Sequence, residues 1–293
     1  MKILIRITVI SLILGLVLIV SGFALGGSYD TVKSLLTDTS DYEAKSFDAT
    51  AHFEKLVVNT ESRNVEIRHG DVSYATATYY LKDSETASFD LVGDTLNVSI
   101  GREEGFFNWF SFGWPSSEVI TLYITLPNDY LIDVETQTMS GYILMDGQFK
   151  DTFVEALSGS INLKGTFNTL DVSVYSGMIT ISDSEVLTTL DVIGKSGLIT
   201  LTNSHITGHV DIEAMSGMIN VSKTTGSGFN LKTASGSISV SLEDIVSTYE
   251  FRLSVGSGLI KLNQNVVSNP YHAGSGILVE CQTGSGSINI VTE

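Results

Sequence analysis

A Ser-Gly pair followed by any residue and then Ile recurs through the second half of the chain, and this repeat limits the fold more than any other feature. Typical copies read "YSGMITI" and "MSGMINV". The glycines of the eight copies are Gly141, Gly159, Gly177, Gly197, Gly217, Gly236, Gly258 and Gly286, spaced by 18 to 22 residues except for a last interval of 28. Such a period is typical of solenoids, whose repeats bury their apolar faces only against neighbouring repeats.

The apolar residues change phase at each Ser-Gly pair. Around Gly177 the inner positions before the pair are Leu170, Val172 and Val174, and those after it are Ile179 and Ile181. The first set alternates in step with Ser176, which places Ser176 on the same predicted inner face. The second set follows at odd offsets and would face outward on a straight strand. We therefore expect a bend or bulge at each pair, where glycine adopts backbone angles that cost other residues energy.

This repeat predicts an all-β fold, a single-stranded β-solenoid in which each coil consists of a strand, a Ser-Gly corner, a second strand and a variable return. We assign the solenoid to residues 127–293, an irregular β region that caps it to 47–126, and a linker to 27–46. Only 3 Pro occur against 27 Gly, which suits β ladders with turns made by Gly, Asn, Asp and Ser. An antiparallel sandwich is the structural alternative, since a hairpin also fits the repeat length.

Residues 1–26 predict a short cytoplasmic tip and a membrane anchor. No charged residue occurs from Ile7 to Leu25, about the length that a helix needs to cross the hydrocarbon core. Because Lys2 and Arg6 precede this run, the positive-inside rule places the N-terminus in the cytoplasm and the bulk of the chain outside the cell. We thus expect a single-pass protein of the cell membrane, with the lipid bilayer as the partner of residues 7–25. A cleaved signal peptide is the alternative, and it also exports the remainder.

Charge and cysteine content exclude several classes of partner. Acidic residues outnumber basic ones 33 to 16, which gives a net charge of −17 and argues against nucleic acid as a partner. Cys281 is the single cysteine, so the chain has no disulfide framework and no cysteine metal cluster. Cys281 lies in phase with the apolar position Val279, and we expect it to be a buried, inert filler.

No motif in the sequence predicts catalysis or a cofactor. The Ser of each Ser-Gly pair is explained by the corner rather than by a nucleophile elbow. The glycine-rich phrases lack the strand-to-helix context of a phosphate cradle, and the nonapeptide of calcium-binding β-rolls is missing. We expect no cofactor, no metal and no enzymatic activity. A carbohydrate-active β-helix is the third-ranked alternative, although no two carboxylates are paired in a defined setting.

The segment "GFFNWFSFGWP" at 105–115 is the first candidate for binding. It contains both tryptophans of the chain and four phenylalanines: Phe106, Phe107, Trp109, Phe110, Phe112 and Trp114. One interpretation is a hydrophobic plug that closes the N-terminal end of the solenoid. The other is a loop that contacts a membrane or a partner, because Trp and Phe settle where membrane meets water.

The second candidate is a ridge along the stacked corners. The residue between Gly and Ile is Met178, Leu198 or Met218 in the central copies, and Tyr142, Ser160, Ser237 or Leu259 in others. Met139, Leu157, Tyr175 and Met215 stand beside it, directly before the Ser-Gly pairs. Return segments usually cover such a ridge. If exposed, it would be a surface for a partner or for self-association.

The repeated "SGSI", "SGMI" and "SGLI" phrases, with "ITLP" at 124–127 before them, resemble the bacterial putative-adhesin domain family from about residue 50 to the C-terminus. The opening membrane segment ending "SGFALGG" is similar to members from Gram-positive bacteria. The resemblance implies a solenoid-like β domain and an envelope location. Related domains also occur in proteins associated with envelope-stress signalling. The family supplies no catalytic residues.

These observations lead to two functional hypotheses. The first is a non-enzymatic, membrane-anchored cell-envelope protein whose extracytoplasmic solenoid is a structural, adhesion or interaction module that contacts an envelope protein or itself. The alternative is an accessory or sensor protein in envelope-stress signalling. With only about six residues expected inside the cell, its coupling would run through the anchor helix.

Overall fold

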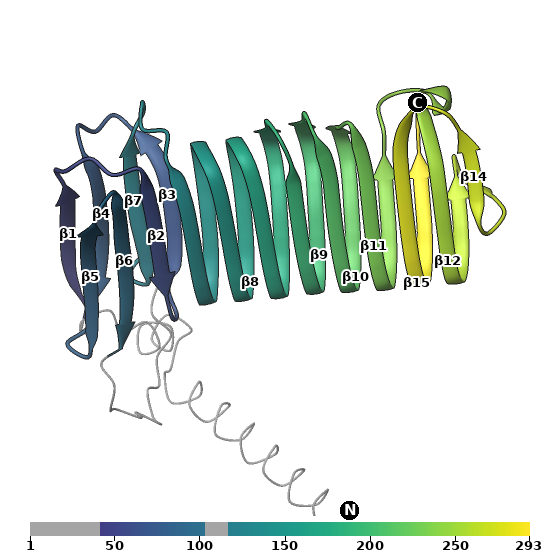
Figure 1. Cartoon of the computed structure of the whole chain (residues 1–293). Helices are drawn as coiled ribbons and strands as arrows, with labels where there is room; N and C mark the ends of the chain where they lie inside the picture. Colours follow the sequence, from purple (N-terminus) through teal and green to yellow (C-terminus); the bar gives the residue numbers. More distant parts are fainter. Residues whose placement is uncertain (1–41, 103–116) are drawn as a thin grey trace, which may run out of the picture.

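The computed structural model describes residues 42–102 and 117–293, which form a rod of stacked β coils with a cap of shorter strands at its N-terminal end (Figure 1). The all-β solenoid prediction is confirmed. The predicted anchor at 7–25 and the aromatic segment at 105–115 lie outside the described residues. Within the described ranges, no helix has the length and apolar character that crossing a bilayer requires.

Six long strands carry the Ser-Gly repeat and pair in parallel. They are β8 (Asp133–Val186), β9 (Leu190–Ile206), β10 (His209–Thr225), β11 (Gly228–Ser241), β12 (Tyr249–Leu262) and β15 (Ile277–Val291). The register places each Ser-Gly pair beside the next, so that Ser176 lies opposite Ser196 and Ser196 opposite Ser216. Parallel pairing excludes the antiparallel sandwich for this part of the chain. We call the side of the rod at which all eight pairs lie the corner edge.

The predicted change of phase at the corner is correct, but the predicted position of the serine is wrong. Val174 before the bend and Ile179 after it are both buried. Ser176 was expected on the same inner face, yet it is exposed, as are the corner serines of the other seven copies. The chain leaves the inner face one residue earlier than expected, because Tyr175 and Ser176 both lie on the outside of the bend.

The corner glycines form a column in which backbone packs directly on backbone. Their φ values lie between 130° and 146°, a region that favours glycine. A Cβ on Gly197 would lie 1.8 Å from the carbonyl oxygen of Gly177 in the preceding coil. The prediction that each corner requires glycine is therefore confirmed. Besides the backbone angle of the bend, a second cause is that a side chain would collide with the backbone of the neighbouring coil.

The order of the coils along the rod differs from their order in the chain. β15, the last strand, lies between β11 and β12 and pairs in parallel with both. The segment from β12 to β15 contains the insertion that lengthens the last repeat interval, and this extra length lets the chain pass over one coil and return. β12, rather than the C-terminal strand, thus ends the rod.

Short elements cover the outer edge of β12. The 3₁₀ helix η1 (Val246–Thr248) precedes it, and β13 (Asn265–Val266) and β14 (Tyr271–Gly274) pair with it antiparallel. Between these two, the Asn269 amide accepts a hydrogen bond from the Val255 N–H at 3.1 Å and donates one to the Val255 carbonyl at 2.7 Å. An open strand edge invites pairing with another chain, and these contacts reduce that risk here.

The N-terminal region continues the solenoid without Ser-Gly pairs. β2 (Lys55–Thr60) and β3 (Asn64–Gly70) form one coil in register with the start of β8. β6 (Thr95–Arg102) and β7 (Thr121–Pro127) form a further coil outside it. Here too the order of the coils differs from their order in the chain, but at this end the earlier segment, rather than the later one, takes the inner place.

Three antiparallel strands close this end of the rod. They are β1 (Glu43–Ala49), β4 (Ala75–Leu81) and β5 (Glu85–Val92). Because β1 already begins at Glu43, the linker predicted at 27–46 is too long at its C-terminal end. The rings of Phe47 and Phe89 stack with their centroids 4.4 Å apart over the end of the core, and Tyr79 packs beside them. Strand side chains thus cover this end of the core.

Candidate interaction surface

The corner edge exposes a row of large apolar side chains. We define the corner strip as Met139, Leu157, Tyr175, Met178, Met215 and Met218, whose exposed fractions range from 48% to 60%. The ridge residues Met178 and Met218 thus lie open to solvent, at least with respect to the residues that the structure describes. Leu198, the third ridge residue, is half-buried, and Leu259 is exposed on the terminal coil.

The local backbone explains why these side chains point outward. The bend places the residue before Ser on the outside of the corner, while the Ile two residues after Gly returns to the core. Met178 and Ile179 are neighbours, yet Met178 is 51% exposed and Ile179 is fully buried. The residues of the strip therefore contribute little to the core and are free to contact something else.

The residues of the corner strip come from four of the first five Ser-Gly coils, and in the fourth coil Lys195 and the half-buried Leu198 hold the equivalent positions. In the coils beyond the fifth, the position of Met215 before Ser is taken by Ala234, Gly284 and Gly256. The smaller residues leave a groove of about 720 Å³ beside the corner edge, and its lining includes Met215, Ile193, Lys195 and Lys232.

The corners are depleted of charge, which contrasts with the rest of the chain. Among the four residues X-Ser-Gly-X of all eight copies, the single charged residue is Lys195. Its ammonium group lies 4.8 Å from the centroid of the Tyr175 ring, within the range of a cation–π contact. No acidic residue occurs at any of these positions in a chain with 33 carboxylates.

Acidic side chains stand instead on the outer face of the strand that precedes most of the corners. Asp171, Asp191 and Asp211 stand opposite one another on successive coils. Partial burial, and next the charges of Asp171 and Asp211, raise the pKa of the Asp191 carboxyl. Like charges in adjacent register repel each other, so this row destabilises the stack slightly. In the described part of the chain, no group of three or more His, Cys, Asp or Glu could hold a metal ion.

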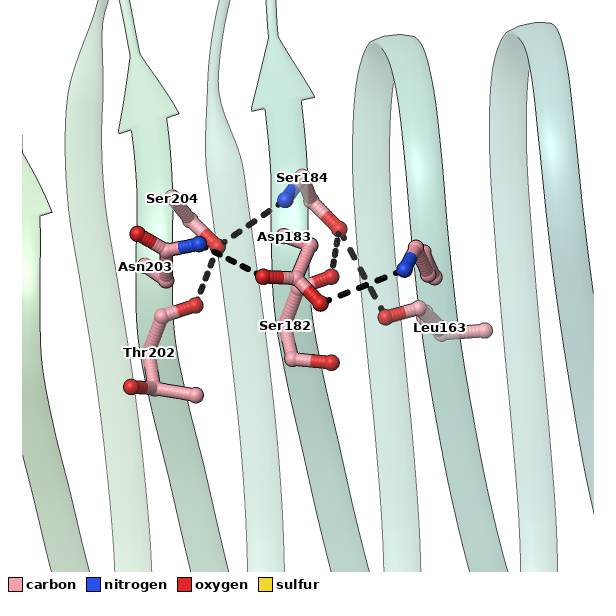
Figure 2. A network of polar contacts seen from close by, with 8 residues as sticks. Leu163, Ser182, Asp183, Ser184, Thr202, Asn203 and Ser204 are labelled. Carbon is pink, nitrogen blue, oxygen red and sulfur yellow. Dashed lines mark hydrogen bonds and ion pairs between the residues drawn. The ribbon is translucent and has the colours of Figure 1, made fainter.

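The edge opposite the corners is polar, and its side chains link successive coils (Figure 2). The Asn203 amide donates a hydrogen bond of 2.5 Å to Asp183, and the Lys164 ammonium lies 3.3 Å from the same carboxylate. The Asn203 bond, and next the contact with Lys164, lower the pKa of Asp183. Asp183 and Asn203 both have φ near 50°, a conformation that Asn and Asp tolerate better than most residues. This network stabilises the stack.

Neither the cysteine nor the groove beside the corners supplies a reactive thiol or an imidazole. Cys281 is fully buried, as predicted, and burial raises the pKa of its thiol, so that the reactive thiolate is disfavoured. The groove beside the corners contains lysines and one glutamate but no His or Cys.

The six aromatic residues at 105–115 lie outside the described residues, but the strands on either side of them, β6 and β7, show where this segment joins the rod. Ile100 near the end of β6 lies opposite Thr60 of β2, and Thr60 lies opposite Thr138 of β8, two residues before the first Ser-Gly pair. β6 therefore ends, and β7 begins, at the corner edge.

Comparison with known proteins identifies the family. The Toastrack DUF4097 family matches residues 53–292. No curated protein matches the chain.

Three solved structures illustrate the range of similar chains. A putative cell adhesion protein from Clostridium sporogenes is 13% identical, with 86% of this chain and 100% of that chain covered and a TM-score of 0.28. A putative adhesin from Parabacteroides distasonis is 12% identical, with 86% and 96% covered and a TM-score of 0.39. A putative lipid binding protein from the same species is 12% identical, with 87% and 98% covered and a TM-score of 0.33. The family match extends over most of the chain and coincides with the solenoid, so the protein belongs to the Toastrack DUF4097 family.

Proposed function

We propose that this chain is a non-enzymatic protein of the cell envelope, held in the cell membrane by residues 7–25 with its N-terminus in the cytoplasm. Its solenoid acts outside the cell as a structural, adhesion or interaction module. The observation that carries the proposal is the corner strip, a row of apolar side chains that contribute little to the core of the rod.

The exposure of this strip needs an explanation beyond folding. Scattered apolar residues on a surface are ordinary, but a contiguous patch marks a contact site. Leu157 and Tyr175 lie on neighbouring coils, as do the glycines beside them. Burial of side chains of this size is worth about 1.5–3 kcal/mol each, which supports a substantial contact when several are covered together.

The capped ends support an action through the side of the rod. The edge of β12 is covered by β13, β14 and Asn269, and at the other end Phe47 and Phe89 stack over the core. The rod is therefore unsuited to end-to-end growth, and its long sides are the surfaces available for binding.

The aromatic segment at 105–115 adds a second candidate contact. Its attachment points lie at the corner edge, on the same side of the rod as the corner strip. We propose that Phe106, Phe107, Trp109, Phe110, Phe112 and Trp114 contact the membrane or a partner, because strand side chains already cover the N-terminal end of the core.

Cell fractionation with protease protection tests the anchoring. The full chain should stay with membranes after carbonate washing, and protease added outside intact cells should degrade the solenoid. Release of the chain into the soluble fraction would refute the anchor.

Site-specific cross-linking in the same cells tests the contact surface. A photoreactive probe on the Ser176→Cys variant should give cross-linked products. The same probe on Ser173→Cys, three residues away on the acidic face, should give few. Equal labelling at both positions would show that the corner strip is no special contact.

A further inference from the structure

We infer that the corner strip lies on the lipid surface of the membrane that carries the protein, so that the rod lies along the membrane rather than projecting from it. The inference rests on the proposed membrane anchoring, and it adds that the lipid surface is what covers the corner strip.

The first observation is the place where the chain enters the solenoid. Glu43 at the start of β1 pairs with Leu81 at the end of β4. β4 runs antiparallel to β7, which begins at the corner edge. β1 therefore also begins at the corner edge, and the 41 residues before the described fold join the rod on this side.

A contact at the first described residue supports this placement. The ring of Tyr42 lies 5.8 Å from the guanidinium carbon of Arg63 and 4.7 Å from the Lys82 ammonium. The Arg63 backbone adjoins Gly141, the first corner glycine. The segment that contains the predicted anchor thus reaches the rod on the side of the Ser-Gly corners, at the outer strand β1, which β4, β7 and β3 separate from the first corner in β8.

The second observation is the distribution of charge. The surface of bacterial membranes is usually anionic, and it repels a chain with a net charge of −17. At the corner edge this repulsion is weaker than on the adjacent acidic face, because the eight X-Ser-Gly-X corners contain no carboxylate and one cation, Lys195. The adjacent face, with its row Asp171, Asp191 and Asp211, lacks this property.

The third observation is the chemistry and shape of the strip. Met and Leu enter the acyl region, and Tyr settles where membrane meets water. The parallel register stacks the five coils from Met139 to Met218 at the spacing of neighbouring strands, so the strip extends over roughly 20 Å. A straight, largely apolar row of this kind, with Lys195 in its fourth coil, fits a flat surface, and it lies on the side where the chain attaches.

The test uses the full chain reconstituted into vesicles of phosphatidylcholine and phosphatidylglycerol. A dye is attached to Ser176→Cys at the corner edge or to Leu187→Cys, an exposed apolar position of the same coil on the opposite edge. The native Cys281 does not compete because it is fully buried. Nitroxide-labelled lipid should quench the dye on the Ser176→Cys variant by more than half and leave the dye on Leu187→Cys nearly unchanged.

A strip variant provides the matched control. In the coil of β11, the positions before and after the Ser-Gly pair are Ala234 and Ser237, so Met139→Ala, Met178→Ser, Met215→Ala and Met218→Ser introduce only residues that the fold already accommodates. This variant should fold as the parent does and lose most of the quenching at Ser176→Cys.

The other outcomes overturn one of the two proposals and distinguish between them. If the full chain fails to float with the vesicles, the anchoring itself is refuted. If it floats but both dyes are quenched equally or not at all, the anchoring stands and the orientation is wrong. If the corner dye is insensitive to nitroxide lipid but shows energy transfer between labelled copies, a second copy of the chain covers the strip and the lipid surface does not.

Discussion

A Cβ atom on Gly177 would lie 1.7 Å from the carbonyl oxygen of Gly159 on the neighbouring coil. The same crowding recurs along the column: a Cβ on Gly217 would lie 1.9 Å from the oxygen of Gly197, and one on Gly236 would lie 1.7 Å from that of Gly217. Each corner glycine thus allows the backbone angle of its own bend and also allows two neighbouring coils to pack at the distance of hydrogen-bonded strands.

Replacement of Gly177 by Ala should therefore be severe. Gly177→Ala places a methyl group in contact with backbone that cannot move aside, and it strains a φ of 146°. We expect a loss of more than about 4 kcal/mol in the free energy of unfolding, the range of exceptional single substitutions. Denaturant unfolding followed by circular dichroism measures it.

Gly93→Ala is the matched control. Gly93 also has a positive φ, 64°, but no atom lies within 4 Å of its Cβ position. Strain alone should cost about 1–2 kcal/mol there. Similar losses for both variants would show that crowding between coils is unimportant.

Met178 and Ile179 should respond in opposite ways to truncation, although they are adjacent. Ile179→Ala leaves a cavity in a fully buried position and should cost about 2–5 kcal/mol. Met178→Ser should change stability by less than about 0.5 kcal/mol, since Met178 is half exposed and Ser237 occupies the equivalent position. Comparable midpoints in denaturant for the two variants would contradict the assignment of inner and outer faces.

Asp191 and Asp183 should give opposite pH dependences. The pKa of Asp191 is raised in the folded state, so its contribution to stability is fully present below the unfolded pKa and is lost as pH rises through the folded pKa. Asp191→Asn should therefore stabilise the protein at neutral pH, by less than about 1 kcal/mol because the carboxyl is only partly buried and solvent screens its interactions. The gain should vanish in acid.

Asp183→Asn serves as the comparison. The pKa of Asp183 is lowered in the folded state, so its contribution is present above the unfolded pKa and is lost as pH falls through the folded pKa. This variant should destabilise at neutral pH and match the parent in acid. Thermal unfolding at a series of pH values measures both effects, and stability changes of the same sign for the two variants would refute the assigned roles of Asp191 and Asp183.

Asn269 should protect the end of the rod. Asn269→Ala removes both side-chain hydrogen bonds to Val255, and we expect a loss of about 1–3 kcal/mol together with stronger self-association through the uncovered β12 edge. Denaturant unfolding and sedimentation velocity measure these effects in detergent-solubilised full chain. Ser268→Ala, which removes only a local bond to the Pro270 carbonyl, should behave as the parent. An unchanged stability and mass for Asn269→Ala would show that the edge needs no cover.

Much of the fold follows from the sequence alone. The period of the Ser-Gly pairs, the alternation before them and the odd offset of Ile179 and Ile181 together require stacked coils with a bend at the glycine. These features are local and occur in eight copies, so each copy independently predicts a bend at glycine and stacking on a neighbouring coil. The burial of Cys281 follows from the same alternation.

The tertiary structure decided what local patterns leave open. The exposure of Ser176 depends on where within the bend the chain leaves the inner face, and strand alternation does not specify this. The place of β15 between β11 and β12 cannot be derived from the repeat, because all coils offer similar edges. It depends instead on which coil β13, β14 and Asn269 can cover.

The candidate surface shows the same division. The sequence determined which residues form the ridge of Met178, Leu198 and Met218 and that the corners contain almost no charge. Whether return segments cover this ridge depends on their path in space. Only the tertiary structure decided that Met178 and Met218 are open and Leu198 is half-buried, and that the chain enters the rod on the same side. The physical reason is that alternation is set within a strand, whereas exposure and coil order are set by contacts between distant parts of the chain.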